Sequence, residues 1–581
     1  MTMKKKKYLP HIASALMLVP MVGCQGLHSD PDGECTTRSR IELEVHPRAL
    51  GGITRAITDA QDPSVAGIIP EDKIVDGQLF IDGIGLTGSH AFMPTEDRWS
   101  AKFEEEIAES TTKRRIATLI NGSRLALRGT DYDIDSKVSL DDLDRMIGES
   151  FLMTSTIDDH ASNFYTLSKE DCTDVRLEVE RVVSKAQLRR AKTPDTETME
   201  ARYGIIDYDA MSWTIAGSAK ECYLFADHAG ELHLGEEGLY GELTTLSAQT
   251  KSHGTYDLMK LSDTGLSQNF KARAIPLFEN GKVETDDGGI STSDRIYFLE
   301  HALTETTTEH AYAADVTYAD VTYVKIYAGL APTKGFRIDN SKVAFARHKV
   351  FESETEAGTG FIESDPAADE GAERPYTPEL LDDALLSPLG TTAPTDRWYW
   401  VDVTDTEWLK GLSDEERAKQ TLREGEDYLA SDPATGPTAP KRRTYLLVHD
   451  SAETFYYGLD DHTIYDTLLA ALAGGNNKIR KYEGGKTVYL SPLNEQRNTE
   501  GLVFSCDTRR NNIYDLILNG ISGLGLNYDP VDPKDPNLPA PGDNPWEPEP
   551  KIPPINGRDN VIRITATPLW WNTMDHVLEL K

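Results

Sequence analysis

Alternation of apolar and polar residues with a period of two is the feature that most constrains the fold of this chain. The alternation is strict in Ile41-Glu42-Leu43-Glu44-Val45 and longer in Val175–Val182. Successive residues of a strand face opposite sides of a sheet, so this pattern predicts strands with one face on a core. Similar runs, rich in β-branched and aromatic residues, predict further strands at 73–81, 211–225, 321–327, 443–449, 487–490, 512–518, 561–567 and 574–580.

Helix signals are few and local. Serine three residues before an acidic residue caps a helix, proline is accepted at the first helical position, and glycine ends a helix. Such signals predict short helices at Ser139 with Asp142, at Thr377-Pro378, at Ser413 with Glu416, and over 463–473 before Gly474-Gly475. Short helices among many strands are typical of an elaborated, mostly β sandwich.

The first residues have the composition of an export signal. Lys4–Lys7 precede a mostly apolar stretch that ends Met21-Val22-Gly23-Cys24 and is too short for a membrane-spanning helix. A small residue before a cysteine at this point is the bacterial lipobox arrangement. It predicts a signal peptide over 1–23 and a lipid on Cys24, whereas the alternative is an ordinary secretory signal that contains a cysteine. We expect a protein that functions outside the cytoplasm.

Charge and cysteine content exclude several classes of function. The 581 residues include 96 acidic and 60 basic ones, giving a formal net charge of −36. Nucleic-acid binding needs clustered lysine and arginine, so we expect no nucleic-acid partner. The five cysteines show no CxxC spacing, which excludes the usual zinc and redox motifs. A Cys172–Cys222 disulfide and buried free thiols both remain open.

Two motif-like strings have simpler interpretations than ligand binding. Gly83–Gly88 matches GxGxxG, but no helical periodicity follows, so a turn is favoured over a dinucleotide site. Asp131, Asp133, Asp135 and Asp142 have the spacing of a calcium-binding loop. Ser136, however, stands where the sharp turn of such a loop needs glycine, and Asp142 also fits a helix cap with Ser139. We favour the helix cap and expect no metal.

Catalytic signatures are missing from the sequence. It contains no HExxH, and residues 520–524 depart from GxSxG at the last position. We expect no enzyme activity and no cofactor.

A proline-rich segment sets the last two predicted strands apart. Residues 529–554 contain ten prolines. Proline blocks helix and sheet and favours an extended, semi-rigid spacer. The final strands are therefore expected to reach away from their own domain.

The order of these features resembles a known family. The matching residues are 510–514, 523–530, the proline-rich spacer and a terminal strand with Trp571 and Leu578-Glu579-Leu580. They are similar to the fimbrillins of Bacteroidales type V pili, and closest to the shaft subunit of the minor fimbrium. Residues 179–186 and 323–330 resemble strands of the two domains of that family.

This resemblance implies a domain layout. It comprises two transthyretin-like β-sandwich domains with short inserted helices, at 56–226 and 227–528. A propeptide at 24–55 precedes them. A spacer at 529–559 and a donor strand at 560–581 follow.

The resemblance also implies an assembly chemistry. An arginine-specific or trypsin-like protease cuts after Arg55, before Ala56, or at the runner-up bond Arg48–Ala49. The cut removes the lipid together with the first strand, which contains Ile41, Leu43 and Val45. The terminal segment of another copy then fills the vacated groove by strand addition. Its apolar residues are Ile562, Ile564, Trp571, Leu578 and Leu580.

The function implied is that of a structural subunit of a cell-surface fimbrium, supporting adhesion or biofilm formation. Its partners are other copies of itself, accessory fimbrial subunits, the protease, and a host or bacterial surface ligand. The precursor would be held at the outer membrane by a temporary lipid. Alternatives are a tip or anchor subunit, and a surface glycan-binding lipoprotein in which Trp570-Trp571, or Trp398 and Trp400, stack on sugars.

Overall fold

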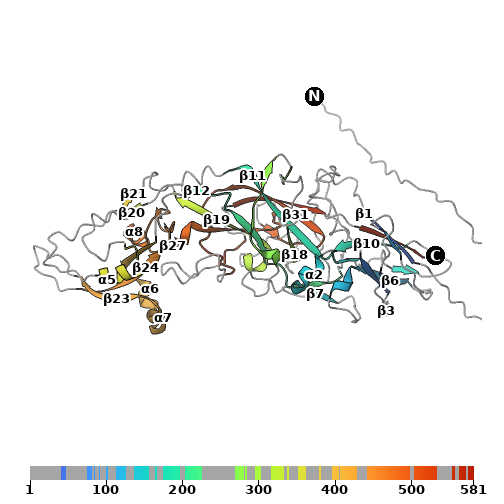
Figure 1. Ribbon diagram of the computed structural model, residues 1–581, viewed down its shortest axis with the longest axis horizontal. Helices are drawn as coiled ribbons and strands as arrows, with labels where there is room; N and C mark the ends of the chain where they lie inside the picture. Colours follow the sequence, from blue (N-terminus) through green and yellow to red (C-terminus); the bar gives the residue numbers. More distant parts are fainter. Residues whose placement is uncertain are drawn as a thin grey trace, which may run out of the picture.

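The protein is mostly β in the computed structural model, which describes about half of the chain (Figure 1). Strands assemble into several sheets, most of them antiparallel, and the helices between them are short. The prediction of a mostly β fold with short inserted helices is confirmed. The residues described are 41–47, 75–81, 84–85, 90–91, 100–102, 113–125, 136–148, 150–155, 164–166, 175–195, 203–225, 268–279, 282–283, 295–301, 316–332, 336–338, 351–361, 378–380, 396–404, 406–427, 441–497, 503–532, 552–555, 562–570 and 574–580.

One sheet, here called the N-terminal sheet, combines early strands with the last strand. Its order is β3-β2-β6-β8-β10-β33-β1-β5, with β4 beside β2 and β9 beside β6. Apart from β33, all of its strands precede residue 182. Their bounds are β1 (Ile41–Pro47), β2 (Asp76–Ile81), β3 (Ile84–Gly85), β4 (His90–Ala91), β5 (Ser100–Lys102), β6 (Lys113–Ile120), β8 (Met153–Ser155), β9 (Phe164–Thr166), β10 (Val175–Arg181) and β33 (Met574–Leu580).

Two further sheets enclose the main core, here called the central sandwich. One has the order β17-β16-β11-β31-β32 with β18 beside β11; the other has β12-β19-β13-β15 with β28 beside β19. Their bounds are β11 (Val183–Asp195), β16 (Leu277–Glu279), β17 (Lys282–Val283), β18 (Arg295–Leu299), β31 (Asn512–Ile521), β32 (Ile562–Trp570), β12 (Gly204–Ile206), β13 (Ser212–Ala216), β15 (Arg273–Ala274), β19 (Tyr323–Pro332) and β28 (Lys486–Pro492).

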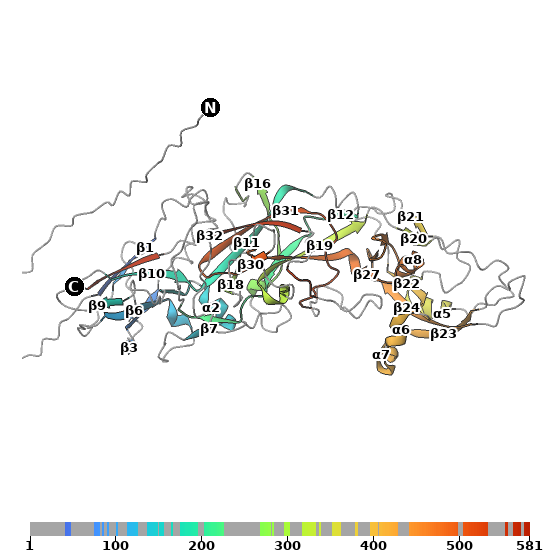
Figure 2. The ribbon, with the colours of Figure 1, turned by 180° about the vertical axis from the view of Figure 1, so that it is seen from behind.

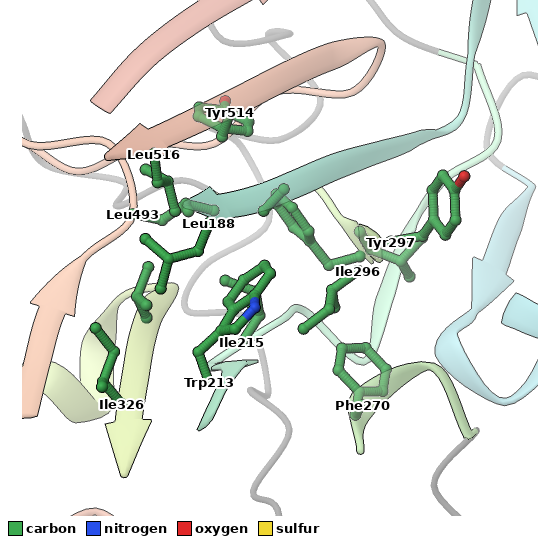
Figure 3. Close-up of a cluster of buried hydrophobic side chains, with 14 of the residues drawn as sticks. Leu188, Trp213, Ile215, Phe270, Ile296, Tyr297, Ile326, Leu493, Tyr514 and Leu516 are labelled. Atoms are coloured by element: carbon green, nitrogen blue, oxygen red, sulfur yellow. The ribbon is translucent and has the colours of Figure 1, made fainter. Parts of the chain in front are cut away.

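Side chains from both sheets meet in the core of the central sandwich (Figure 3). Leu188 of β11 and Leu516 of β31 come from one sheet, and Trp213 of β13 and Ile326 of β19 come from the other. All four are at most 1% exposed. Burying a large apolar side chain contributes about 1.5–3 kcal/mol, so this core holds the two sheets together.

A third region is inserted into the central sandwich. It lies between β19 and β28, which pair directly from Tyr323↔Pro492 to Gly329↔Lys486. Its own core joins Tyr399, Leu446, Tyr456 and Leu468. Its elements are β20 (Phe336–Ile338), α5 (Glu354–Gly360), β21 (Pro378–Leu380), β22 (Arg397–Asp402), α6 (Glu407–Gly411), α7 (Asp414–Lys419), β23 (Leu422–Asp427), β24 (Lys441–Asp450), β25 (Phe455–Gly458), β26 (Ile464–Tyr465), α8 (Leu468–Ala473) and β27 (Ile479–Tyr482).

The described elements are spread along one long axis. Strands β20 to β24 and helices α5 to α8 lie toward one end, the central sandwich lies between, and β1, β10 and the C-terminus lie toward the other end (Figures 1 and 2).

The remaining described strands form two small two-stranded sheets. They are β7 (Lys137–Ser139) with β14 (Glu221–Tyr223), and β29 (Gln496–Arg497) with β30 (Val503–Ser505).

Local predictions of strands and helices have mixed outcomes. The capping box of Ser413 and Glu416 is present at α7, and Ser139 caps a 3-10 turn that leads into α2 (Leu143–Met146). The helix expected over 463–473 begins later, because Thr467 caps α8. The prediction of a helix at Thr377-Pro378 is wrong, because Pro378 begins β21, which pairs with β20.

The sheets do not divide at residue 226. Strands β11, β12 and β13 come before this residue, yet they pair with β31 and β19, which come after it. Residues 211–225 contain two strands that pair with different partners, since β13 joins β19 and β14 joins β7.

Candidate functional site

The C-terminal strand β33 lies inside the N-terminal sheet, between β10 and β1. It pairs antiparallel with β1 over seven residue pairs, from Ile41↔Leu580 to Pro47↔Met574. Its other edge pairs with β10 over five, from Val175↔Leu578 to Val179↔Met574. The far edge of β1 pairs with β5, so both strands have neighbours on both sides.

The register places apolar residues on a shared face. Directly paired residues of neighbouring strands lie on the same face of a sheet. Leu578 is paired with Leu43 on one side and Val175 on the other, and Leu580 is paired with Ile41. The next row joins His576 to Val45 and Leu177, so this face is apolar apart from one histidine. Glutamates 42 and 579 are paired on the opposite face.

The structure therefore brings together two of the predicted site groups. Ile41, Leu43 and Val45 lie in β1, beside the strand that carries Leu578 and Leu580. The resemblance implied that a terminal strand would take the place of the first strand. In this chain the two strands occupy adjacent positions, and both are present in one sheet.

Other residues of the predicted donor segment lie elsewhere. Ile562 and Ile564 belong to β32, where they pair with Ile521 and Leu518 of β31. Ile564 packs, half-buried, against the core of the central sandwich. Only residues 571–573 separate β32 from β33. Outside the described residues lie Cys24, Arg48, Ala49, Arg55, Ala56 and Trp571.

Two described parts of the proline-rich spacer, at its start and at 552–555, pack on the central sandwich. Tyr528 is buried beside Tyr323 and Val488, and Asp529 forms a buried ion pair with Lys325. Ile555 is buried beside Val321 and its N–H donates to the carbonyl of Val316. The described part of the spacer is thus attached to the sandwich.

A buried charged network, which the sequence did not reveal, fixes the end of β10. The Arg510 guanidinium is fully buried and donates to Glu300 Oε1 from Nε at 3.0 Å and from Nη2 at 2.6 Å. It also donates to the carbonyl oxygens of Tyr223 and Leu224, at 2.5 and 2.8 Å. Glu180 of β10 lies 3.8 Å from its Nε. These partners lie far apart in sequence, so no local pattern signals them.

Burial and charge shift several pKa values in this network. Burial alone would lower the pKa of Arg510, but Glu300 and its other partners raise it above the ordinary value. Burial raises the pKa of the neighbouring Cys222 thiol to about 12 and lowers the pKa of His301 to about 3. Cys222 is a buried free thiol, Cys506 is buried, and Cys172 lies outside the described residues.

The alternative ligand sites receive no support from the described residues. Within the glycine pattern Ile84 pairs back with Ile81, which is a hairpin rather than the start of a helix. Asp142 pairs with Arg145, and the other three predicted calcium ligands lie outside the described residues. No group of three or more potential metal ligands occurs among the residues the structure describes.

Trp398 and Trp400, two of the candidates for sugar stacking, have side-chain contacts within the protein. Trp400 is 1% exposed, and its indole N–H donates to the carbonyl of Ala357. Trp398 stacks on His449 with ring centroids 4.1 Å apart. Trp570 is the last residue of β32 and pairs with Asn512.

In the part of the chain that is described, no helix has the length and apolar character to cross a membrane.

Comparisons with known proteins find likeness only among solved structures. No protein-family model matches the chain, and no curated protein sequence matches it. A candidate cell adhesion protein of Parabacteroides distasonis is similar over 92% of this chain and 98% of its own, at 12% identity and a TM-score of 0.37. A second such protein from that organism covers 87% of this chain and 97% of its own, at 11% identity and a TM-score of 0.35.

A fimbrilin of Porphyromonas gingivalis is also similar to this chain. The likeness covers 92% of this chain and 97% of the fimbrilin, at 11% identity and a TM-score of 0.34. At these identities and TM-scores the likeness does not place the chain in a family.

Proposed function

We propose that this protein is a structural subunit of a cell-surface fimbrium and that it polymerises by exchanging β33 between copies after proteolysis. The observation that carries the proposal is the position of β33, held in register between β10 and the first described strand, β1. The same proposal is supported by the lipobox, by the arginines between β1 and β2, and by the resemblance to fimbrillins.

In this mechanism the pairing of β1 with β33 keeps β33 in the sheet of its own chain. In the precursor, β33 is paired on both edges, with seven residue pairs to β1 and five to β10. A cut after Arg55 or Arg48 would leave β1 attached by strand pairing alone. Its loss would leave one edge of β33 with unpaired N–H and C=O groups, which lowers the cost of leaving the sheet.

Exchange then links copies head to tail. The β33 strand of one copy would pair with β10 of the next, forming the same register in trans that it forms within one chain. Such a contact uses different surfaces on the two copies and does not close, so it propagates a filament. Because only residues 571–573 lie between β32 and β33, the receiving β10 must lie close to the end of β32.

Cleavage of the purified full-length chain with a trypsin-like protease tests the proposal. We expect filaments in electron micrographs after cleavage and only monomers before it. The double variant Arg48→Ala with Arg55→Ala should remain monomeric under the same treatment. Filaments formed equally well without cleavage would contradict the proposal that β1 holds β33 in place until proteolysis.

Two matched substitutions in β33 test the exchange itself. Leu578→Asp changes a residue on the face shared with Leu43 and Val175, and it should abolish filaments. Glu579→Gln changes the adjacent residue on the opposite face and should leave assembly intact. Circular dichroism checks that both variants are folded. Normal filaments from folded Leu578→Asp would rule out β33 as the exchanged strand.

A further inference from the structure

Strand β19 crosses the middle of its sheet and is covered on both faces. Val324 and Ile326 point into the core of the central sandwich. Tyr323 and Tyr327 belong to a second cluster on the other face, together with Leu526 and Tyr528. Because residues of a strand alternate between faces, Lys325 lies on the face of the two tyrosines, under the start of the proline-rich segment.

On the face that carries this second cluster, Lys325 pairs with Asp529. Lys325 Nζ donates to Asp529 Oδ2, and both side chains are 0% exposed. The other carboxyl oxygen, Oδ1, accepts a 2.9 Å hydrogen bond from the backbone N–H of Val531. Lys325 Nζ also lies 5.6 Å from the centre of the Tyr327 ring. An amine and a carboxyl group are therefore held in contact where water has no access.

A buried ion pair of this kind is poorly stabilised as two charges. Removing both ions from water is unfavourable, and their mutual attraction offsets this only in part. Transfer of one proton from the ammonium to the carboxylate gives a neutral amine beside a neutral acid. In surroundings of low polarity this neutral pair avoids the cost of burying charge.

We propose that Lys325 and Asp529 are joined by an intramolecular isopeptide bond. The Nζ lone pair of the neutral amine attacks Cγ of the protonated Asp529 carboxyl group. The bond from Cγ to the hydroxyl oxygen breaks, and that hydroxyl leaves as water with a proton from the amine. One Nζ–Cγ amide bond and one water molecule are formed, and no atom is oxidised or reduced.

The surroundings favour each stage of this step. Fixed contact between the two groups removes the entropy cost of bringing them together. The Val531 N–H stabilises negative charge that develops on Oδ1 when Cγ becomes tetrahedral. Apolar and aromatic neighbours, including Val488 and Leu490, keep water away, which protects the finished amide from hydrolysis.

The bond would close a covalent ring around the inserted region. Lys325 and Asp529 are 204 positions apart, and the inserted region at 336–482 lies between them. Tension entering through β33 and the spacer would pass from Asp529 directly into β19 and bypass that region. This mechanical role rests on the proposed function, whereas the bond itself does not.

Peptide mapping of the denatured, purified full-length chain tests the bond. We expect a branched peptide that joins the Lys325 and Asp529 segments, with a mass lower than their sum by one water. Recovery of the two segments as separate linear peptides, at their unmodified masses, would overturn the proposal. The readout is covalent and does not depend on filament formation, so its failure is distinguishable from failure of the proposed function.

Two variants provide controls for the chemistry. Lys325→Arg keeps a positive charge opposite Asp529 but lacks the primary amine, so it should give only linear peptides. Asp529→Asn should give the same branched connection through loss of ammonia in place of water. A branched peptide from Lys325→Arg would show that another residue forms the link and would overturn the assignment.

Discussion

Replacing Arg510 by methionine tests the buried network that anchors β10 to the central sandwich. Methionine retains most of the side-chain length but removes the charge and all donors. Glu300, which is 3% exposed, would lose the two hydrogen bonds from the Arg510 side chain and keep the one from its backbone N–H. The carbonyl groups of Tyr223 and Leu224 would each lose a donor.

The expected loss is large for one substitution. A buried charge left without its partner costs about 3–5 kcal/mol. A buried carbonyl that loses a donor adds about 1 kcal/mol, less for Leu224, which keeps the hydrogen bond from the Thr154 hydroxyl. We expect Arg510→Met to lower the opening free energy of β31 and β11 by about 4 kcal/mol. Adding Glu300→Gln removes the unpaired charge and should restore about 2 kcal/mol of it.

Hydrogen exchange of the β31 and β11 backbone amides measures this loss locally, which suits a chain with several sheets. Lys410→Met is the matched control. It removes an exposed ion pair with Glu407, in which the two side chains are 56% and 91% exposed. The control should have no measurable effect. An effect of Arg510→Met no larger than that of the control would refute the structural role of the network.

Three further predictions concern buried or strained positions. His301 has its pKa lowered by burial to about 3, so the unfolded chain binds a proton at higher pH than the folded one. Its contribution to stability is complete above about pH 6.5 and declines as the pH falls toward about 3. Thermal unfolding at several pH values should show a shallower decline for His301→Gln; an unchanged profile would contradict this. The Cys222 thiol, whose pKa burial raises to about 12, should resist alkylation in the folded protein and react after unfolding, as followed by mass. Gly217 has a φ of +72°, and an added Cβ would lie 2.1 Å from the carbonyl oxygen of Val321. Gly217→Ala should cost about 2 kcal/mol in urea unfolding, whereas Gly358→Ala, in α5 with open space around it, should be neutral or slightly stabilising.

The sequence predicted strands best where one face is apolar and the other polar. The alternation of residues 41–45 marks β1 almost to its end, and the strand predicted over 574–580 coincides with β33. Strand β11 was predicted only at its start. The strand predicted from the pattern ends at Val182, and the resemblance reaches residue 186, whereas β11 continues to Asp195. Ser184, Lys185, Gln187 and Arg189 are buried although they are polar, so both faces of this strand are covered.

The candidate site was predictable only in its parts. Local pattern identified a first strand and a terminal strand, and the resemblance connected them. That Leu578 lies between Leu43 and Val175 depends on strand order and register, which pairing across the whole chain determines. The helix expected at Thr377-Pro378 is absent for the same reason, since pairing with β20 outweighs a local signal.

The position of β33 also has a consequence for how the chain folds. The N-terminal sheet joins residue 41 to residue 580, so β1 and β10 are made long before the strand that lies between them. Contacts of such large sequence separation form slowly, and an incomplete sheet exposes edges that aggregate. During synthesis this sheet cannot be completed until residues 574–580 have been made. The slowest kinetic phase of refolding should therefore be the insertion of β33.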